Sequence, residues 1–135
     1  LIDACDAYVS LHRGEGFGLV IAEAMALGKP VVATGYSGNM DFMTEENSYP
    51  VDFRIVRNPK RAAPYGKGCW WAEADVDHAA ALVGEIIGHP KAARAKGELA
   101  AETIARRFSA DAVGKMMRER LGEVRRAKRG HQFEE

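Results

Sequence analysis

The stretch Glu15–Thr34, EGFGLVIAEAMALGKPVVAT, decides the fold. A short apolar segment at residues 7–11, AYVSL, precedes it and has the pattern of a strand. After the glycine-rich turn, helical periodicity extends over Leu19–Leu27, and Gly28 stands where a left-handed helix cap is expected. The apolar run Val31–Thr34 predicts a second, buried strand. Because strand, turn, helix and strand form a βαβ unit, we predict an α/β fold, a Rossmann-like parallel sheet with flanking helices.

The rest of the chain has the pattern of a further turn, one weak strand and several helices. Gly35–Asn39 predicts a second turn, in which Ser37 or Asn39 caps a short helix that runs through Met43. Farther along we expect a strand over 51–56, a surface loop over 58–68, a short apolar stretch over 69–72, helices over about 75–87, 91–107 and 110–128, and a frayed end over 130–135. Asp75 or Asp77 is expected to begin the first of these helices, and Ser109 to cap the last.

Length and composition limit the class of protein. The chain has 135 residues, which is room for one domain. It carries 19 Lys and Arg and 19 Asp and Glu, and this zero net charge argues against a dedicated nucleic-acid binder. No apolar run approaches the roughly 18 residues of a membrane helix, so we do not expect the chain to span a bilayer.

The cysteines, tryptophans and basic residues have ordinary structural interpretations. Cys5 and Cys69 lie far apart without a C-x-x-C pair, so we expect two inert buried thiols in a reducing compartment. Trp70 and Trp71 are expected to be core or interface aromatics rather than a platform for sugar stacking. The basic run over 118–129 is expected to form a solvated helix face, with a membrane-surface helix as the alternative.

The chain begins with Leu1 rather than Met, and residues 1–5 have the pattern of the last turn of a helix. We therefore interpret the sequence as a fragment of a longer protein, with a processed amino terminus as the alternative. Residues 1–110 are assigned to a half-domain, and residues 111–135 to a helix and tail of the same domain.

The turn between Leu11 and Leu19 is the candidate site. In a parallel α/β sheet, ligands bind at the carboxyl ends of the strands. Here the glycines let backbone amides approach a ligand, and the free N–H groups and positive dipole end of the following helix suit a phosphate or diphosphate. Glu15 in the turn and Glu23 in the helix would repel phosphate, so we expect them to accept hydrogen bonds from sugar hydroxyls. Carboxylates beside a diphosphate suggest a nucleotide sugar.

The spacing of two glutamates carries little weight in a chain with 12 of them, so the context decides. The whole stretch Glu15–Thr34 closely resembles the Glu-x7-Glu signature of retaining GT-B glycosyltransferases, especially family 4 (glycosyl transferases group 1). Four further segments are similar to that family: 8–13, 35–42, 75–80 and the helix break at 108–109. The resemblance covers most of residues 6–110 and implies the second half of a GT-B carboxyl-terminal, donor-binding domain.

The resemblance also implies residue roles. Glu15 would contact hydroxyls of the donor sugar and is the catalytic candidate, and Glu23 would contact the ribose of the nucleotide. The amides that would line the donor sugar and diphosphate are those of Gly16, Phe17, Gly18 and Leu19. The alternatives are a loop carboxylate that caps a neighbouring helix for Glu15, and an ordinary solvated helix position for Glu23.

Two further candidates come from the residues themselves. His12, with Arg13 beside it, precedes the turn and could touch phosphate or acceptor, although a structural role at the strand end is nearly as good an interpretation. Gly38 and its neighbours in the second turn could present amides to the site, with a plain helix-capping turn as the alternative.

The resemblance implies a parent enzyme that transfers a hexose from a UDP-, GDP- or ADP-linked sugar to a glycan, lipid-linked or other hydroxyl acceptor, with retention of configuration. The family is generally independent of metal, so no metal or cofactor is expected. An acceptor-binding amino-terminal domain and an Arg/Lys pair would lie outside this chain. We therefore expect the chain alone to be inactive and to self-associate through exposed apolar patches. A cytoplasmic location is expected, with peripheral attachment at the inner membrane face as a variant.

Three other functions were weighed. A dinucleotide-binding oxidoreductase is disfavoured, because Leu19 stands where G-x-G-x-x-G needs a third glycine after Gly14 and Gly16. A non-catalytic nucleotide- or carbohydrate-binding module of the same fold is the more serious rival, since fold does not separate the two. A purely structural or interaction domain would bind no nucleotide sugar at all.

Overall fold

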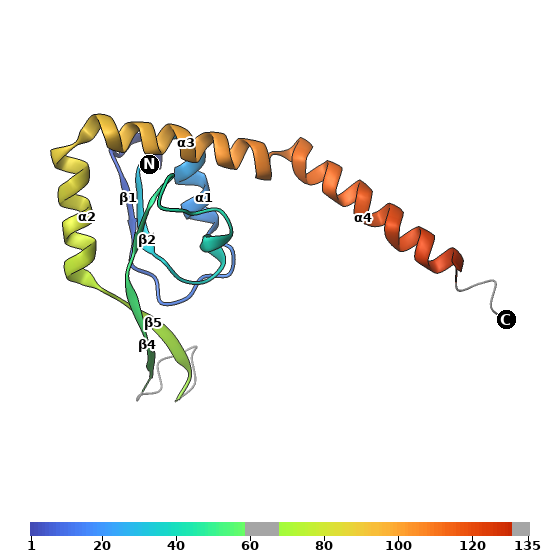
Figure 1. Cartoon of the computed structure of the whole chain (residues 1–135), viewed down its shortest axis with the longest axis horizontal. Coiled ribbons are helices and arrows are strands. Elements are labelled where there is room, and N and C mark those ends of the chain that lie inside the picture. Colours follow the sequence, from blue (N-terminus) through green and yellow to red (C-terminus); the bar gives the residue numbers. More distant parts are fainter. Residues whose placement is uncertain (59–67, 131–135) are drawn as a thin grey trace.

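A three-stranded parallel sheet lies at the centre of the computed structural model, which describes residues 1–58 and 68–130 (Figure 1). The strands are β1 (Tyr8–Ser10), β2 (Val31–Thr34) and β3 (Tyr49–Val51), and their order is β1-β2-β3. Val9 pairs with Val32, and Ala33 pairs with Pro50. The predicted α/β fold, a parallel sheet with flanking helices, is confirmed.

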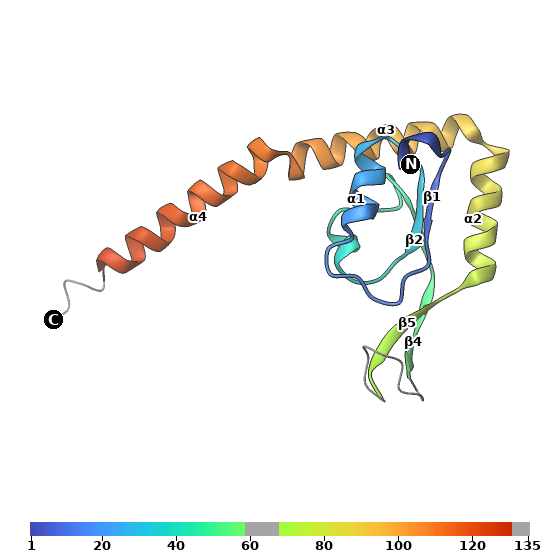
Figure 2. The same cartoon turned by 180° about the vertical axis from the view of Figure 1, so that it is seen from behind.

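Helices lie on both faces of the sheet, and every residue of its central strand β2 is buried. Figures 1 and 2 show helix α1 (Leu19–Ala26) on one side of the strands and helix α2 (Val76–Gly88) on the other. Val31 and Ala33 belong to the hydrophobic cluster under α1, whereas Val32 between them belongs to the cluster under α2. Successive strand residues point to opposite faces, which explains why all of β2 is apolar except its last residue.

Helix α3 (Pro90–Phe108) runs across the amino-terminal ends of the strands and packs on α1 (Figures 1 and 2). The two helices come so close that a Cβ at Gly97 of α3 would overlap the carbonyl group of Gly28. Gly28 has φ 69°, as predicted for the residue that follows α1. It therefore ends one helix and lets a second approach.

A two-stranded antiparallel hairpin extends beyond the carboxyl ends of the sheet strands (Figure 1). Its strands are β4 (Phe53–Arg57) and β5 (Trp70–Ala74), with Phe53 opposite Ala74 and Arg57 opposite Trp70. The strand predicted over 51–56 is confirmed for residues 53–56, which belong to β4, but Val51 is the last residue of β3 in the other sheet. Residues 70–72 of the expected apolar stretch belong to β5, and residues 59–67 of the expected loop lie outside the described residues.

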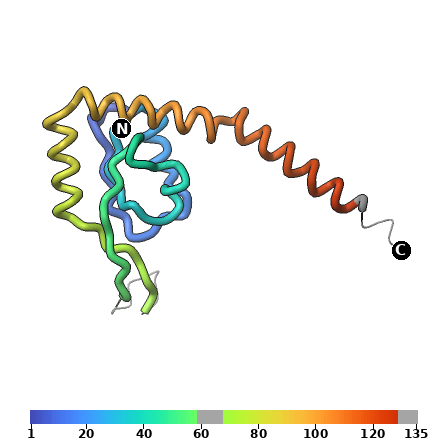
Figure 3. The backbone as a smooth tube through the Cα atoms, viewed as in Figure 1, coloured from blue at the N-terminus to red at the C-terminus, as the bar shows by residue number. Residues whose placement is uncertain are grey.

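Helix α4 (Ala110–Gly130) extends away from the sheet as an arm (Figure 3). Its cap is as predicted, since the hydroxyl of Ser109 accepts a hydrogen bond from the amide of Ala112 at 3.3 Å. Asp75 likewise caps α2 by accepting from the amide of His78 at 3.0 Å. None of the helices in residues 1–58 and 68–130 is long and apolar enough to cross a membrane.

Three predictions about local structure are wrong. Cys5 is exposed and Cys69 half-buried, so neither is a buried thiol. Trp70 is 65% exposed on the hairpin and so lies outside the core, and its expected role as an interface aromatic stays a prediction. Ser37 makes no capping hydrogen bond to the short 3₁₀ helix η2 (Gly38–Asp41) that follows it. A second 3₁₀ helix, η1 (Ile2–Ala4), takes the place of the expected end of an α-helix.

Candidate functional site

Two turns meet at the carboxyl edge of the sheet. The first turn (residues 11–18) joins β1 to α1, and the second turn (residues 35–39) follows β2. Glu15 connects them through its backbone: its carbonyl oxygen accepts from the amide of Gly38 at 3.3 Å and from the hydroxyl of Ser37. Its amide donates to the same hydroxyl oxygen at 3.3 Å. The parallel sheet brings the two turns together because both leave the same edge.

Glycines make this meeting sterically possible. A Cβ at Gly38 would overlap the carbonyl oxygen of Gly16, so the second turn can approach the first only without a side chain there. Gly18 has φ 88°, a conformation that a residue with a side chain rarely adopts, and it is the N-cap of α1. The two glycines therefore fix how the chain enters the helix.

The amino-terminal end of α1 presents backbone donors next to Glu15. Within the part of the chain that the structure describes, no side chain caps this end at Gly18. The first intrahelical hydrogen bond is donated by the amide of Ala22 to the carbonyl oxygen of Gly18 at 2.8 Å. The amides of Leu19, Val20 and Ile21 therefore have no partner within the helix. Free amides and the positive end of the helix dipole form a place that favours an anion.

The side chain of Glu15 is exposed and lies against the start of α1. Its Oε1 accepts a hydrogen bond from the amide of Gly16 at 3.0 Å, and its Cγ would be 3.4 Å from a Cβ on Gly18. This leaves Oε2 and the remaining lone pairs of the carboxylate to accept from hydroxyl donors. Glu15 therefore stands at the edge of the amide-lined end rather than inside it.

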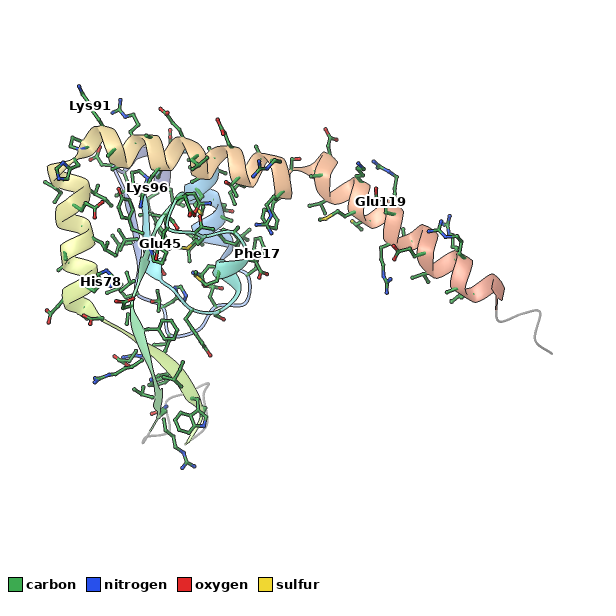
Figure 4. The ribbon with its side chains drawn as sticks, viewed as in Figure 1. Phe17, Glu45, His78, Lys91, Lys96 and Glu119 are labelled. Carbon is green, nitrogen blue, oxygen red and sulfur yellow. The ribbon has the colours of Figure 1, made fainter. Side chains whose placement is uncertain are left out.

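Phe17 anchors the first turn in the body of the fold (Figure 4). Its ring centroid lies 5.1 Å from that of Phe42 and 5.4 Å from that of Phe108, at the end of α3. Aromatic pairs at these separations add stabilisation beyond the area they bury. The side chain of Phe17 thus has a packing role, and its backbone amide is what it can offer to a ligand.

His12 is held by the second turn. Its Nε2 lies 3.0 Å from the carbonyl oxygen of Tyr36 and 3.1 Å from Oδ1 of Asn39, and its Nδ1 lies 3.4 Å from the hydroxyl of Ser10. Both partners of Nε2 are acceptors, so we assign the proton to Nε2. The structural interpretation of His12, a residue that ties the end of β1 to the second turn, is the one that these contacts support.

Asn39 is a residue of this arrangement whose role the sequence did not reveal. It is fully buried, and its Nδ2 donates to the carbonyl oxygen of Thr34 at 3.0 Å, at the end of β2. Sequence reasoning expected only an amide or a cap from this turn. The signal that could have found it is an amide side chain in the turn that follows a buried strand, because the last carbonyl group of such a strand needs a hydrogen-bond donor.

Glu23 lies on the exposed flank of α1, one turn into the helix. It lines a cavity of about 530 Å³ together with Leu1, Ile2, Asp3, Ala26 and Leu27, and no residue of the two turns lines that cavity. At a rise of roughly 1.5 Å per residue, Glu23 is about 7 to 8 Å along the axis from the cap at Gly18. The two glutamates are thus on the same helix–turn unit, one at its end and one on its flank.

Arg13 joins the first turn to the hairpin. Its guanidinium makes a bidentate ion pair with Glu73 at 3.0 and 3.1 Å and lies 4.8 Å from the ring of Trp71. The hydrogen bond from Arg13 holds the pKa of the Glu73 carboxyl below its usual range, and the same bond raises the pKa of Arg13. The carbonyl oxygen of Arg13 also accepts from the amide of Ala72 at 2.9 Å. Arg13 therefore fastens β5 to the site.

Over residues 1–58 and 68–130, no group of three or more His, Cys, Asp or Glu side chains is placed to hold a metal ion.

The sequence profile described as Glycosyl transferases group 1 matches residues 1–102, about three quarters of the chain, and this range includes both turns, α1 and the hairpin. The chain belongs to the glycosyl transferases group 1 family. A comparison with curated protein sequences finds no match.

Solved structures show the same fold. The crystal structure of Anabaena Alr3699/HepE in complex with UDP matches 90% of this chain and 29% of the HepE chain, with a TM-score of 0.67 and 24% sequence identity. HepE in complex with UDP and glucose, and HepE in complex with UDP-glucose, match with TM-scores of 0.66 and 0.65. At this identity the likeness extends to the fold alone, and the chain spans less than a third of the HepE chain.

In this group 1 domain, the structure brings most of the predicted site residues together. The two turns contain six of them, His12, Glu15, Gly16, Phe17, Gly18 and Gly38, and Leu19 is the first residue of α1. Glu23 stands apart from them on the helix flank. The contacts of Ser37 and Asn39 were not foreseen, because they depend on pairing between segments more than 20 residues apart.

Proposed function

We propose that this chain is the donor-binding part of a glycosyltransferase that uses a nucleotide sugar. The observation that carries the proposal is the free amino-terminal end of α1 beside the Glu15 carboxylate, at the carboxyl edge of a parallel sheet, in a chain of the glycosyl transferases group 1 family. Free amides suit a diphosphate, and a carboxylate with open lone pairs suits sugar hydroxyls.

In this proposal the donor lies along the start of α1. The amides of Phe17, Gly18 and Leu19 face the sugar and the diphosphate, while the amide of Gly16 beside them holds the Glu15 carboxylate. Glu15 accepts hydrogen bonds from sugar hydroxyls and stabilises the sugar as the bond to the diphosphate breaks. Glu23 accepts from the hydroxyls of the nucleotide ribose. The separation of the two glutamates along the axis is compatible with one extended ligand that touches both.

The resemblance to the family is the basis for proposing the acceptor, the stereochemistry and the metal independence of the reaction. The parent protein would transfer a hexose to a glycan, lipid-linked or other hydroxyl acceptor with retention of configuration. It would also include an acceptor-binding domain of which this chain is not part. Transfer would proceed without a metal ion, because the α1 amides and cationic side chains from outside this chain would offset the charge of the leaving diphosphate.

The experiment is a calorimetric titration of the full-length protein with UDP-, GDP- and ADP-glucose, followed by a transfer assay with and without EDTA. HepE, solved with UDP and with UDP-glucose, makes the uridine donor the first to test. We expect one nucleotide to be bound at least about tenfold more tightly than the others, a difference of about 1.4 kcal/mol, and transfer that EDTA does not reduce. Binding of none of the three would contradict the proposal and favour a structural domain.

A further inference from the structure

Ser37 has an unusual backbone conformation. Among the residues that the structure describes, it is the only one other than glycine with a positive φ, at φ 83° and ψ −155°. This region is occupied almost entirely by glycine, because a Cβ makes it costly, and outliers of this kind cluster at functional sites. Glycines stand nearby at 35 and 38, so the serine is the exception within its own turn.

The hydroxyl of Ser37 has one set of partners, the backbone of Glu15. It donates to the carbonyl oxygen of Glu15 and accepts from the amide of Glu15 at 3.3 Å. Ser37 is exposed, so water could satisfy its hydroxyl in any other orientation. Neither burial nor backbone preference therefore explains a serine at this position, whereas the two bonds to Glu15 do.

The rest of the second turn gives Ser37 a fixed support. The buried side chain of Asn39 joins the end of β2, at Thr34, to His12. Gly38 fits against the backbone of Gly16 with no room for a side chain. The position of the Ser37 hydroxyl is therefore set by the sheet, and the hydroxyl in turn sets the backbone of Glu15.

We propose that Ser37 is a positioning residue for the donor sugar: it holds the backbone of Glu15, and through it the carboxylate, in the place where the sugar hydroxyls bind. The inference rests on the proposed function, in which Glu15 is the sugar ligand. A glycine would adopt this backbone with less strain, but it has no hydroxyl, and Glu15 would then keep only one hydrogen bond to the second turn, from the amide of Gly38 to its carbonyl oxygen.

The test compares Ser37→Gly and Ser37→Ala in the full-length protein, with UDP-glucose and UDP as probes. Both substitutions remove the hydroxyl, but only Ser37→Gly also relieves the strain. We expect Ser37→Gly to unfold at a higher temperature than Ser37→Ala, and both to bind UDP-glucose about three- to tenfold more weakly, the range of one or two ordinary hydrogen bonds. The affinity for UDP, which lacks the sugar, should change less than about twofold and reports that the site is folded. Ser109→Ala removes a serine hydroxyl that caps α4 and should change neither affinity.

A double-mutant cycle with Glu15→Ala then shows whether Ser37 acts through Glu15. In the Glu15→Ala background, we expect Ser37→Ala to cause no further loss in the ratio of UDP-glucose affinity to UDP affinity. Wild-type UDP-glucose affinity in Ser37→Gly, or full additivity in the cycle, overturns the positioning role. If Glu15→Ala itself leaves UDP-glucose affinity unchanged, the proposed function fails instead.

Discussion

At Gly38 the two turns come so close that the chain tolerates no side chain, and this contact sets the shape of the site. We expect Gly38→Ala to push the second turn away from Gly16, which should lower the free energy of unfolding by about 1 to 3 kcal/mol, as overpacking does. It should also weaken donor binding. Thermal unfolding of the full-length protein measures the first effect, and calorimetric titration with the donor measures the second.

The matched control is Gly84→Ala on α2, where a Cβ would meet nothing within 4 Å. Alanine is the better helix former by about 0.5 to 1 kcal/mol, so this variant should be slightly more stable and bind donor normally. Equal behaviour of the two variants would show that the close approach at Gly38 is not needed.

The ring of His12 gives a second test at the scale of one residue. The contacts to Tyr36 and Asn39 both use Nε2. A glutamine amide nitrogen can approach the position of Nε2, whereas an asparagine nitrogen falls near that of Nδ1. We therefore expect His12→Gln to retain donor affinity within about threefold and His12→Asn to lose about tenfold, as expected for a lost buried hydrogen bond.

A phosphate contact or a proton transfer by the imidazole would give a different pattern, with both His12 variants impaired alike. The tautomer can also be read directly, because ¹⁵N chemical shifts of the imidazole of the wild-type protein should show the neutral ring protonated at Nε2. A ring protonated at Nδ1 would contradict the contacts described here.

The role of a residue is predictable from sequence when its hydrogen-bond partners are within a few residues, and it is not predictable when they lie far along the chain. Gly28 as a helix end and Asp75 and Ser109 as caps follow from the few residues around them. Ser37 and Asn39 are expected from sequence to act locally as caps, but Ser37 binds Glu15 and Asn39 contacts His12, both in the first turn and more than 20 residues earlier. The sequence shows which polar residues occur in a turn, and only the pairing of the turns shows what those residues bind.

At the scale of elements, the hairpin depends on the link between Arg13 and Glu73. Because the hydrogen bond from Arg13 lowers the pKa of Glu73 in the folded chain, the link is complete above the usual carboxyl pKa of about 4.3. It is lost as the pH falls through the lowered pKa. We expect the amide of Ala72, which donates to Arg13, to lose roughly twofold to fivefold of its protection against hydrogen exchange, the effect of an exposed ion pair.

Glu73→Gln should show this reduced protection already near neutral pH and no further loss in acid. Glu102→Gln, an exposed glutamate on α3, serves as the control and should behave as the wild type. If Ala72 were equally protected in Glu73→Gln and in the wild type, the ion pair would not be what fastens β5 to the first turn.

The hairpin also marks the limit of element prediction. The run Val51–Val56 has a strand pattern, yet it contributes to two sheets, with Asp52 between them. The local pattern predicts that the segment is extended. Which sheet it joins is decided by its partners, since Val51 pairs with β2 whereas residues 53–56 pair with β5. By contrast, the βαβ unit was predictable because its glycine turn, helix and buried strand all agree.

At the scale of the whole molecule, α4 is the helix whose apolar side chains are least covered by the rest of the fold. Its side chains Met116, Met117 and Leu121 are each more than half exposed, and α4 extends away from the sheet (Figures 1 and 3). We expect this 135-residue chain in isolation to self-associate through that face, and the double substitution Met117→Glu and Leu121→Glu to shift it towards monomer in sedimentation velocity. Charge reversal at Arg126, which helix periodicity places on the opposite side of α4 from Met117 and Leu121, should have little effect. A monomer at high concentration in the unmodified chain would contradict this prediction.

We propose that the start of α1 holds a nucleotide sugar between Glu15 and Glu23. Calorimetric titration of the full-length protein and its two Glu→Ala variants with UDP and UDP-glucose, with Glu102→Ala as the control, tests this placement. We predict that Glu23→Ala weakens both ligands by about tenfold or more, the effect of losing hydrogen bonds to a charged group, and that Glu15→Ala weakens only UDP-glucose to that extent. Wild-type affinity of both variants for both ligands would contradict the claim.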